Sequence, residues 1–150
     1  MQIGGRANAI LAQKRVSSVW TIDPNATVIA AIRLMDEKSV GALPVVDNGR
    51  LVGIVSERDY TRKVILKERF SQEILVSEIM TKQLLTVAPS DSVTECMRIM
   101  TEKRVRHLPV LEGTDLVGIL SIRDVVNWLI SAQTATIDSL HCYITGYYPA

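Results

Sequence analysis

Two stretches of the chain carry apolar residues at the three- and four-residue spacing of an amphipathic helix. The first follows Thr27 and the second follows Ser92; their apolar positions are Val28, Ala31, Ile32 and Met35, and Val93, Cys96, Met97 and Met100. Because such positions share one face, the pattern predicts two helices, each with one buried stripe. Ser92 and Glu95 have the spacing of a capping box, so we expect the Glu95 carboxylate to bond back to the Ser92 amide.

Each predicted helix is followed by two short apolar runs that indicate a β-hairpin. In the first case, runs at 43–46 and 51–55 flank Asn48-Gly49, a dipeptide that favours a tight turn because both positions take positive φ. In the second, the turn is Glu112 to Asp115, a weaker signal. Extended segments are expected at 19–22 and 84–87, and second helices from position 57 to about 67 and from 122 to about 131.

These two patterns are copies of one unit. Residues 19–60 align with residues 84–125 at a constant shift of 65 without a gap, and about 18 of the 42 pairs are identical. We therefore expect an α/β (α+β) fold made of two pseudo-symmetric β-α-β-β-α repeats packed as one module. The expected divisions are an N-terminal segment 1–17, repeat 1 at 18–69, a linker 70–83 with a short helix, repeat 2 at 84–131 and a C-terminal helical tail 132–150.

Composition and charge narrow the range of functions. The 150 residues include 17 Lys and Arg against 16 Asp and Glu, a formal net charge of +1, and aromatic residues make up 5%. This balance argues against a broad surface for nucleic acid or anionic membrane, although a local cluster can still hold one phosphate. The two cysteines lack metal-site or redox spacing, and we see neither a secretory leader nor a membrane span, so we expect a cytoplasmic protein.

The repeated strings resemble the cystathionine-β-synthase (CBS) domain, and the pair resembles the tandem arrangement called a Bateman module. The resemblance rests on 40–47 with 53–59 in the first copy and on 105–110 with 118–124 in the second, and it covers residues 18–131. It implies a stand-alone regulatory module that binds an adenine nucleotide (AMP, ADP, ATP or NAD). Some members are similar to binders of metal or S-adenosylmethionine. We expect no metal here.

The string Gly-x-x-Ser-x-x-Asp occurs in both copies and has two interpretations. Ser56 with Asp59, and Ser121 with Asp124, can simply cap a helix. Alternatively, a short carboxylate beside the amides of a helix start can accept both hydroxyls of a ribose, while the serine and an arginine face a phosphate. The use of Asp, where Glu would cap equally well, favours the second interpretation.

The resemblance implies two composite clefts. One combines Ile119, Ser121, Arg123 and Asp124 with Thr21, Val40, Gly41 and Ala42; the other combines Ile54, Ser56, Arg58 and Asp59 with Thr86, Val105, Arg106 and His107. Pro44 and Pro109 are expected to help line the adenine slots. Because Gly41-Ala42 resembles an adenine site more than a phosphate site, we expect tighter binding in the cleft that uses Asp124.

The basic residues of the second copy carry two readings. Lys103 and Arg104 have the position of a solvated helix end, favoured by the helix dipole. Arg106 matches the place where related modules are expected to hold phosphate. His107 is balanced between a ligand contact and a core-edge histidine bonded to a carbonyl.

Catalysis is not indicated, because the chain shows no nucleophile triad and no phosphate-binding glycine string. Cys96 falls on the buried stripe and is expected to be inert. The segments up to residue 15 and from 134 to 150 are expected to dock on the module or on a second subunit, with a role in partner recognition as the alternative; the second segment carries Ile137, Leu140, Tyr143, Ile144, Tyr147 and Tyr148. We expect a homodimeric disc, because the resemblance implies pairing through helical faces and because Met35, Met100 and Trp128 are expected to leave apolar helix surface uncovered. We expect this dimer to act in signal transduction on an unknown effector protein. A structural module with empty clefts and a nucleotide-using enzyme are the alternatives.

Overall fold

The computed structural model describes residues 4–14, 19–70 and 72–145, and within the last helix it leaves the side chains at 136, 139, 143 and 145 undescribed. The Tyr143 side chain and residues Arg15, Tyr147 and Tyr148 therefore lie outside the described part. The helices are α1 (Ala7–Gln13), α2 (Val28–Lys38), α3 (Glu57–Tyr60), the π-helix η1 (Thr61–Ile65), α4 (Val76–Ile79), α5 (Val93–Lys103) and α6 (Ile122–Thr145). The strands are β1 (Ala42–Asp47), β2 (Arg50–Ser56), β3 (His107–Glu112) and β4 (Asp115–Ser121).

The two central helices begin where the sequence predicts. The Thr27 hydroxyl accepts a hydrogen bond from the Ala30 amide at the start of α2, and the Ser92 hydroxyl accepts one from the Glu95 amide at the start of α5. The expectation that the Glu95 carboxylate bonds back to the Ser92 amide is wrong, because both of its oxygens accept hydrogen bonds from the Arg98 guanidinium instead. A guanidinium one turn further along offers a charge-assisted pair of bonds that a single amide does not match.

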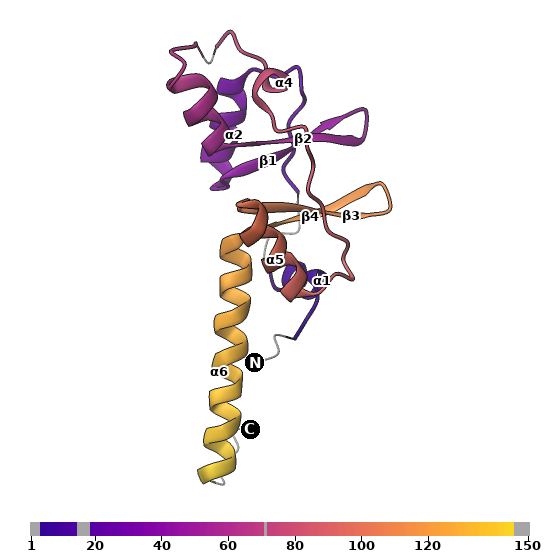
Figure 1. Ribbon diagram of the computed structural model, residues 1–150, viewed down its shortest axis with the longest axis vertical. Coiled ribbons are helices and arrows are strands. Elements are labelled where there is room, and N and C mark those ends of the chain that lie inside the picture. Colours follow the sequence, from indigo (N-terminus) through magenta and orange to yellow (C-terminus); the bar gives the residue numbers. More distant parts are fainter. Residues whose placement is uncertain (1–3, 15–18, 71, 146–150) are drawn as a thin grey trace.

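Both repeats contain the predicted hairpin. β1 pairs antiparallel with β2, and β3 with β4, each with an irregularity at the fourth residue of its first strand. At the first turn Asn48 has φ 49° and Gly49 has φ 79°, as the dipeptide requires. The expected extended segments pair at one residue each, Ile22 with Val45 and Val87 with Val110. Figure 1 shows the hairpins one above the other, with their turns on the same side.

Each repeat has its own core, and each core is completed by a segment that precedes the other repeat. α1 buries Ala7 and Ile10 among the side chains of repeat 2, and the 70–83 linker buries Ile74, Val76 and Ile79 among those of repeat 1. The backbone contacts match: the Ala7 amide donates to the Asp91 carbonyl, and the Val76 amide donates to the Ala26 carbonyl. The linker is therefore part of the first core, and the repeats hold each other in place through exchanged segments.

The predicted second helices differ between the copies. In repeat 1, α3 passes into η1, and the helix ends before a left-handed residue, Glu68, with φ 54°. In repeat 2, α6 continues through the expected boundary at 131 and extends away from the rest of the molecule (Figure 1). Among the described residues, no helix combines the length and the apolar character needed to cross a membrane.

The structure corrects the argument from uncovered apolar surface. Met35 and Met100 are 2% and 3% exposed and belong to the cores of their own repeats. Trp128 lies over Gly5, and its indole N–H donates to the Gly4 carbonyl at 3.2 Å. The expectation of buried Cys96 is confirmed; burial, followed by the charge of Asp91, raises the pKa of its thiol to about 11. The expected docking of Ile10 and Leu11 is also confirmed.

Candidate functional site

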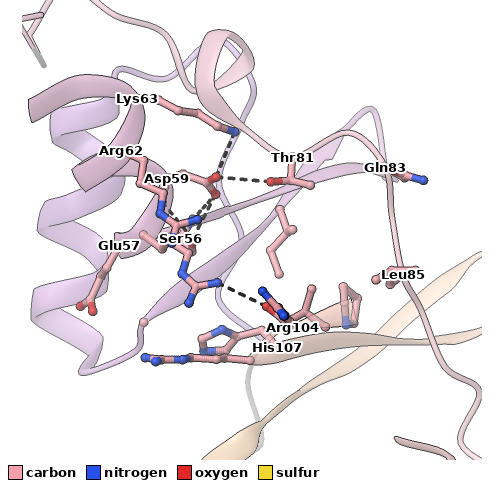
Figure 2. Close-up of a pocket in the computed structure, with 16 residues that line it drawn as sticks. Ser56, Glu57, Asp59, Arg62, Lys63, Thr81, Gln83, Leu85, Arg104 and His107 are labelled. Carbon is pink, nitrogen blue, oxygen red and sulfur yellow. Dashed lines mark hydrogen bonds and ion pairs between the residues drawn. The ribbon is translucent and has the colours of Figure 1, made fainter. Parts of the chain in front are cut away.

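A cavity of about 370 Å³ lies between the repeats, with Asp59 in its wall (Figure 2). β2 and α3 supply one side, and the end of α5 with the start of β3 supplies the other. The residues that line it are Gly41, Ile54, Ser56, Glu57, Arg58, Asp59, Arg62, Lys63, Thr81, Gln83, Leu85, Arg104, Val105, Arg106, His107 and Pro109. The composite cleft expected around Asp59 is thus a cavity in the structure.

Asp59 both caps α3 and reaches the cavity. Its Oδ2 accepts hydrogen bonds from the Ser56 amide at 2.9 Å and from the Ser56 hydroxyl at 3.0 Å. Its Oδ1 accepts one from the Thr81 hydroxyl at 3.3 Å and lies 3.0 Å from Lys63 Nζ. The capping interpretation therefore holds, and it uses one oxygen. The other oxygen has the Thr81 hydroxyl and the Lys63 ammonium as partners, and Lys63 Nζ also donates to the Ile79 carbonyl at 2.7 Å.

Positive charge dominates this cavity. The side chains of Arg58, Arg62, Lys63, Arg104 and Arg106 line it, against the carboxylates of Glu57 and Asp59. Arg58 also crosses between the repeats, donating from its guanidinium to the Arg104 carbonyl at 3.3 Å. Five cations against two anions around one open cavity favour a ligand that carries several negative charges.

Arg104 combines the two readings of the basic segment. It ends α5 in a left-handed conformation with φ 55°, as a helix end would, and it also lines the cavity. Lys103 is an exposed residue of the last helical turn. The loop that follows is fixed by the Ile122 amide, which donates to the Arg106 carbonyl at 2.8 Å.

His107 lies at the boundary of the two clefts. It lines the Asp59 cavity and faces Gly41, where an added Cβ would be 3.5 Å from the imidazole Cε1. Burial lowers its pKa, opposed by the charge of Asp124 and reinforced by those of Lys14 and Arg106. The imidazole is therefore neutral near pH 7 and presents one donor and one acceptor nitrogen.

The second cleft is smaller and its carboxylate is occupied. A cavity of about 200 Å³ is lined by Leu11, Lys14, Val19, Trp20, Lys38, Val40, Ala42, Val117, Gly118 and Ile119. Lys14 Nζ lies 2.9 Å from Asp124 Oδ2 and donates to the Ile119 carbonyl at 2.9 Å. Asp124 also caps α6, accepting from the Ser121 amide at 2.8 Å. The N-terminal segment thus places a cation on the carboxylate that was expected to receive a ribose.

The predicted site residues fall into two groups. Those that line the Asp59 cavity are Ile54, Ser56, Arg58, Asp59, Val105, Arg106, His107 and Pro109, joined by Gly41 from the other predicted set. Val40, Ala42 and Ile119 line the smaller cavity. Thr21, Pro44, Thr86, Ser121, Arg123 and Asp124 line neither, and Leu85 takes the place expected for Thr86. The geometry thus favours the Asp59 cleft over the Asp124 cleft that we expected to bind more tightly.

Sequence reasoning missed several cavity residues. The four-residue spacing of Asp59 and Lys63 at a helix start is a readable signal for their ion pair. Thr81 and Lys14 belong to segments outside the aligned repeat, so no internal comparison points to them. Among the described residues, no group of three or more His, Cys, Asp or Glu side chains is placed to hold a metal ion.

Comparison with known proteins agrees with this architecture. The sequence model of the CBS domain matches twice, at residues 14–65 and 76–131, which together make up most of the chain. The chain belongs to the CBS domain family. The two matches coincide with the two repeats and extend each of them into its preceding segment.

Solved structures and curated relatives include close matches. A protein with CBS domains from Burkholderia ambifaria MC40-6 is 48% identical with a TM-score of 0.83, over 86% of this chain and 96% of the other. The hexameric CBS-CP12 protein from bloom-forming cyanobacteria is 32% identical with a TM-score of 0.73, over 83% and 71%. The mitochondrial CBS domain-containing protein CBSX3 of Arabidopsis thaliana is 40% identical over 81% of this chain, which spans 62% of its length. The CBS domain pairs of stand-alone CBS proteins are generally regulatory.

Proposed function

We propose that this CBS pair is a regulatory module that binds one adenine nucleotide in the Asp59 cavity and acts on a separate effector protein. The observation that carries the proposal is the cluster of five cationic side chains that line this open cavity beside the Asp59 carboxylate. A nucleotide needs a phosphate holder, a ribose acceptor and a slot for its base, and this cavity offers candidates for all three.

The ribose acceptor is Asp59 Oδ1. It is held in place because Oδ2 is fixed by the Ser56 amide, and a ribose hydroxyl would take the place of the long Thr81 contact at 3.3 Å while Lys63 stays anchored to the Ile79 carbonyl at 2.7 Å. A diol that donates to this oxygen makes charge-assisted hydrogen bonds, which are stronger than neutral ones.

The base slot lies against the apolar residues Ile54, Leu85, Val105 and Pro109. Neutral His107 borders it and can both donate to and accept from a purine edge. The volume of about 370 Å³ lies within the range of small-molecule sites, whereas the 200 Å³ of the second cleft lies below it. We therefore propose one principal site per chain.

The remaining parts of the proposal concern context. The ligand we propose is AMP, ADP, ATP or NAD, and its binding would make the module a sensor of energy or redox state in signal transduction. A homodimeric disc and a cytoplasmic location stay predictions. Light scattering that gives only a 16.6 kDa monomer over a concentration series would remove any dimer.

Isothermal calorimetry with AMP, ATP, NAD and NADH tests the proposal. The decisive variant is Asp59→Asn, which keeps an oxygen for the Ser56 amide and removes the charge. A charged hydrogen bond contributes ~1.5–3 kcal/mol, so affinity should fall roughly 10- to 100-fold. Asp138→Asn, on the exposed part of α6, is the matched control and should bind as the wild type does.

Two results would contradict the proposal. If none of the four nucleotides binds below about millimolar, equivalent to ~4 kcal/mol, the clefts are not nucleotide sites and a purely structural module is the better reading. If Asp59→Asn binds the nucleotide as tightly as the wild type while Asp124→Asn binds it more weakly, the ligand occupies the Asp124 cleft.

A further inference from the structure

The cations of the Asp59 cavity belong to one cleft and not to the repeated unit. Four of the five have an uncharged residue at the corresponding position of the other repeat: at the shift of 65, Arg62, Lys63, Arg104 and Arg106 correspond to Asn127, Trp128, Ser39 and Gly41. The fifth, Arg58, corresponds to Arg123, which lines neither cavity. Because both repeats form the same hairpin without a shared basic cluster, the fold does not require these charges.

Most of these cations have no anionic partner. Among the described residues, the guanidinium groups of Arg62, Arg104 and Arg106 take part in no hydrogen bond or ion pair. Lys63 differs, because its ammonium group lies 3.0 Å from Asp59 Oδ1. Unpaired like charges around one cavity repel each other and lower the stability of the protein until an anion lies between them.

The charge balance of the cavity indicates how much negative charge the ligand carries. Apart from the Lys63–Asp59 pair, four guanidinium groups face the carboxylate of Glu57, so three positive charges remain. A terminal phosphate carries about two negative charges near pH 7, and each further phosphate of a chain adds about one. AMP, and NAD with its two diester phosphates, therefore carry less charge than the cavity can neutralise, whereas a chain of two or three phosphates matches it.

The positions of the arginines suit a chain of phosphates. Arg62 lies on the η1 wall beside Asp59, and Arg104 lies on the opposite wall near His107 (Figure 2). Arg58 connects the two walls, because it donates to the Arg104 carbonyl at 3.3 Å. A guanidinium group holds a phosphate through two parallel N–H bonds. Groups on both walls can thus hold different phosphates of one chain that starts beside the ribose acceptor.

We propose that the Asp59 cavity selects its ligand by the length of the phosphate chain, and that Arg62 and Arg104 are the selecting residues. The ligand class is a nucleotide with a chain of two or three phosphates, such as ADP or ATP, and not AMP or NAD. This inference rests on the nucleotide site proposed above. It adds that the phosphate chain supplies most of the binding free energy, so inorganic tripolyphosphate, which has the chain without ribose or base, binds in the same place.

Calorimetry with AMP, ADP, ATP and NAD, and with orthophosphate and tripolyphosphate as probes that lack a base, tests this selection. EDTA leaves the phosphates their full charge, and a fixed ionic strength keeps screening constant. Each added phosphate should strengthen binding roughly tenfold, because it gains a charge-assisted contact that partial exposure weakens. NAD should bind about as AMP does, and tripolyphosphate should compete with ATP.

Substitution of the selecting residues separates them from the rest of the site. Arg62→Gln and Arg104→Gln should each lower the affinity for ATP and tripolyphosphate roughly tenfold and the affinity for AMP by less, so the ratio of ATP to AMP affinity falls. The control, Arg33→Gln, removes the same charge from an exposed position of α2 that lines neither cavity and should bind every ligand as the wild type does.

Unfolding without ligand checks the repulsion argument. Arg62→Gln removes one of the like charges, so its unfolding midpoint should equal or exceed that of the wild type. A lower midpoint would show that Arg62 serves the fold, and the selecting role would be overturned.

The binding results distinguish this inference from the nucleotide site itself. If ATP and AMP bind equally tightly, the nucleotide site stands and selection by chain length is overturned. It is also overturned if tripolyphosphate binds no more tightly than orthophosphate, or if Arg62→Gln binds every ligand as Arg33→Gln does. If tripolyphosphate binds as expected and none of the nucleotides binds, recognition of the chain stands and the adenine-nucleotide function fails.

Discussion

Replacing Lys14 with Met should open the second cleft to a nucleotide. In the wild type, Lys14 Nζ lies 2.9 Å from Asp124 Oδ2 and donates to the Ile119 carbonyl at 2.9 Å. A ligand that uses Asp124 must first displace this ammonium group. Met keeps the length and apolar stem of Lys, so α1 stays docked through Ile10 and Leu11 while the competing charge is removed.

The size of the effect follows from the exposure of the pair. The Lys14 side chain is 29% exposed and that of Asp124 16%, so the contact is stronger than a surface salt bridge and weaker than a fully buried one. A charged hydrogen bond contributes ~1.5–3 kcal/mol, and partial exposure reduces this to about 1–2 kcal/mol. Since 1.4 kcal/mol is tenfold, Lys14→Met should strengthen binding in the Asp124 cleft by roughly 5- to 30-fold.

The assay is calorimetry with the nucleotide that binds the wild type, read as stoichiometry and as the affinity of the weaker site. We expect about one site per chain in the wild type and a second measurable site in the variant. Lys103→Met, which removes a positive charge from an exposed helix end, is the control for overall charge. A variant whose stoichiometry and weaker affinity both match those of Lys103→Met would show that Lys14 does not guard the cleft.

Three further predictions concern stability. Ile10→Ala, although outside the repeats, should lower the free energy of unfolding by ~2–4 kcal/mol in urea titrations because the side chain is 1% exposed in the second core; a loss within the range of a surface substitution would refute the exchange of segments. Gly53→Ala should lower the free energy of unfolding by about 1–3 kcal/mol, and by more than Gly118→Ala does. An added Cβ at Gly53 would meet the Thr81 backbone oxygen at 3.1 Å as well as the Met80 side chain, whereas one at Gly118 would meet the flexible side chain of Leu11. Burial lowers the pKa of His107 below its usual 6.5, so below about pH 6.5 the unfolded chain binds a proton more readily than the folded chain, and the free energy of unfolding falls. The urea midpoint should therefore drop more between about pH 7.5 and about pH 5.5 in the wild type than in His107→Gln. Equal drops in the two proteins would contradict this.

Local signals in the sequence account for most of the fold. The Asn48-Gly49 turn, the Thr27 cap and the Ser92 cap each depend on a few neighbouring residues, and all three occur as predicted. Where a local signal has a competitor it fails, as at Glu95, whose carboxylate bonds to Arg98. Helical structure after residue 131 was predicted, but its continuity with the helix that starts at Ile122 was not, because no second copy exists there for comparison.

The sequence pointed to only some of the residues in the candidate site. Among residues inside the repeat, Asp59 was found because the second copy repeats its pattern, and Arg106 because its position matches the resemblance to the CBS domain. Lys14 and Thr81 were not, since they reach the clefts from segments whose docking depends on the packing of the whole chain. This difference is why we propose the Asp59 cleft as the principal site, although the sequence favoured the Asp124 cleft: the Asp124 carboxylate is paired with Lys14 in the structure.

The exchange of segments also sets the order in which the protein can fold as it is synthesised. Repeat 1 has its full core once α4 has left the ribosome, near residue 80, whereas α1, made first, waits for partners as distant as Val125. At the usual rate of synthesis this wait lasts on the order of ten seconds. The first helix of the nascent chain therefore remains without its core while the first repeat is already complete, and the last repeat to be made is the one that captures it.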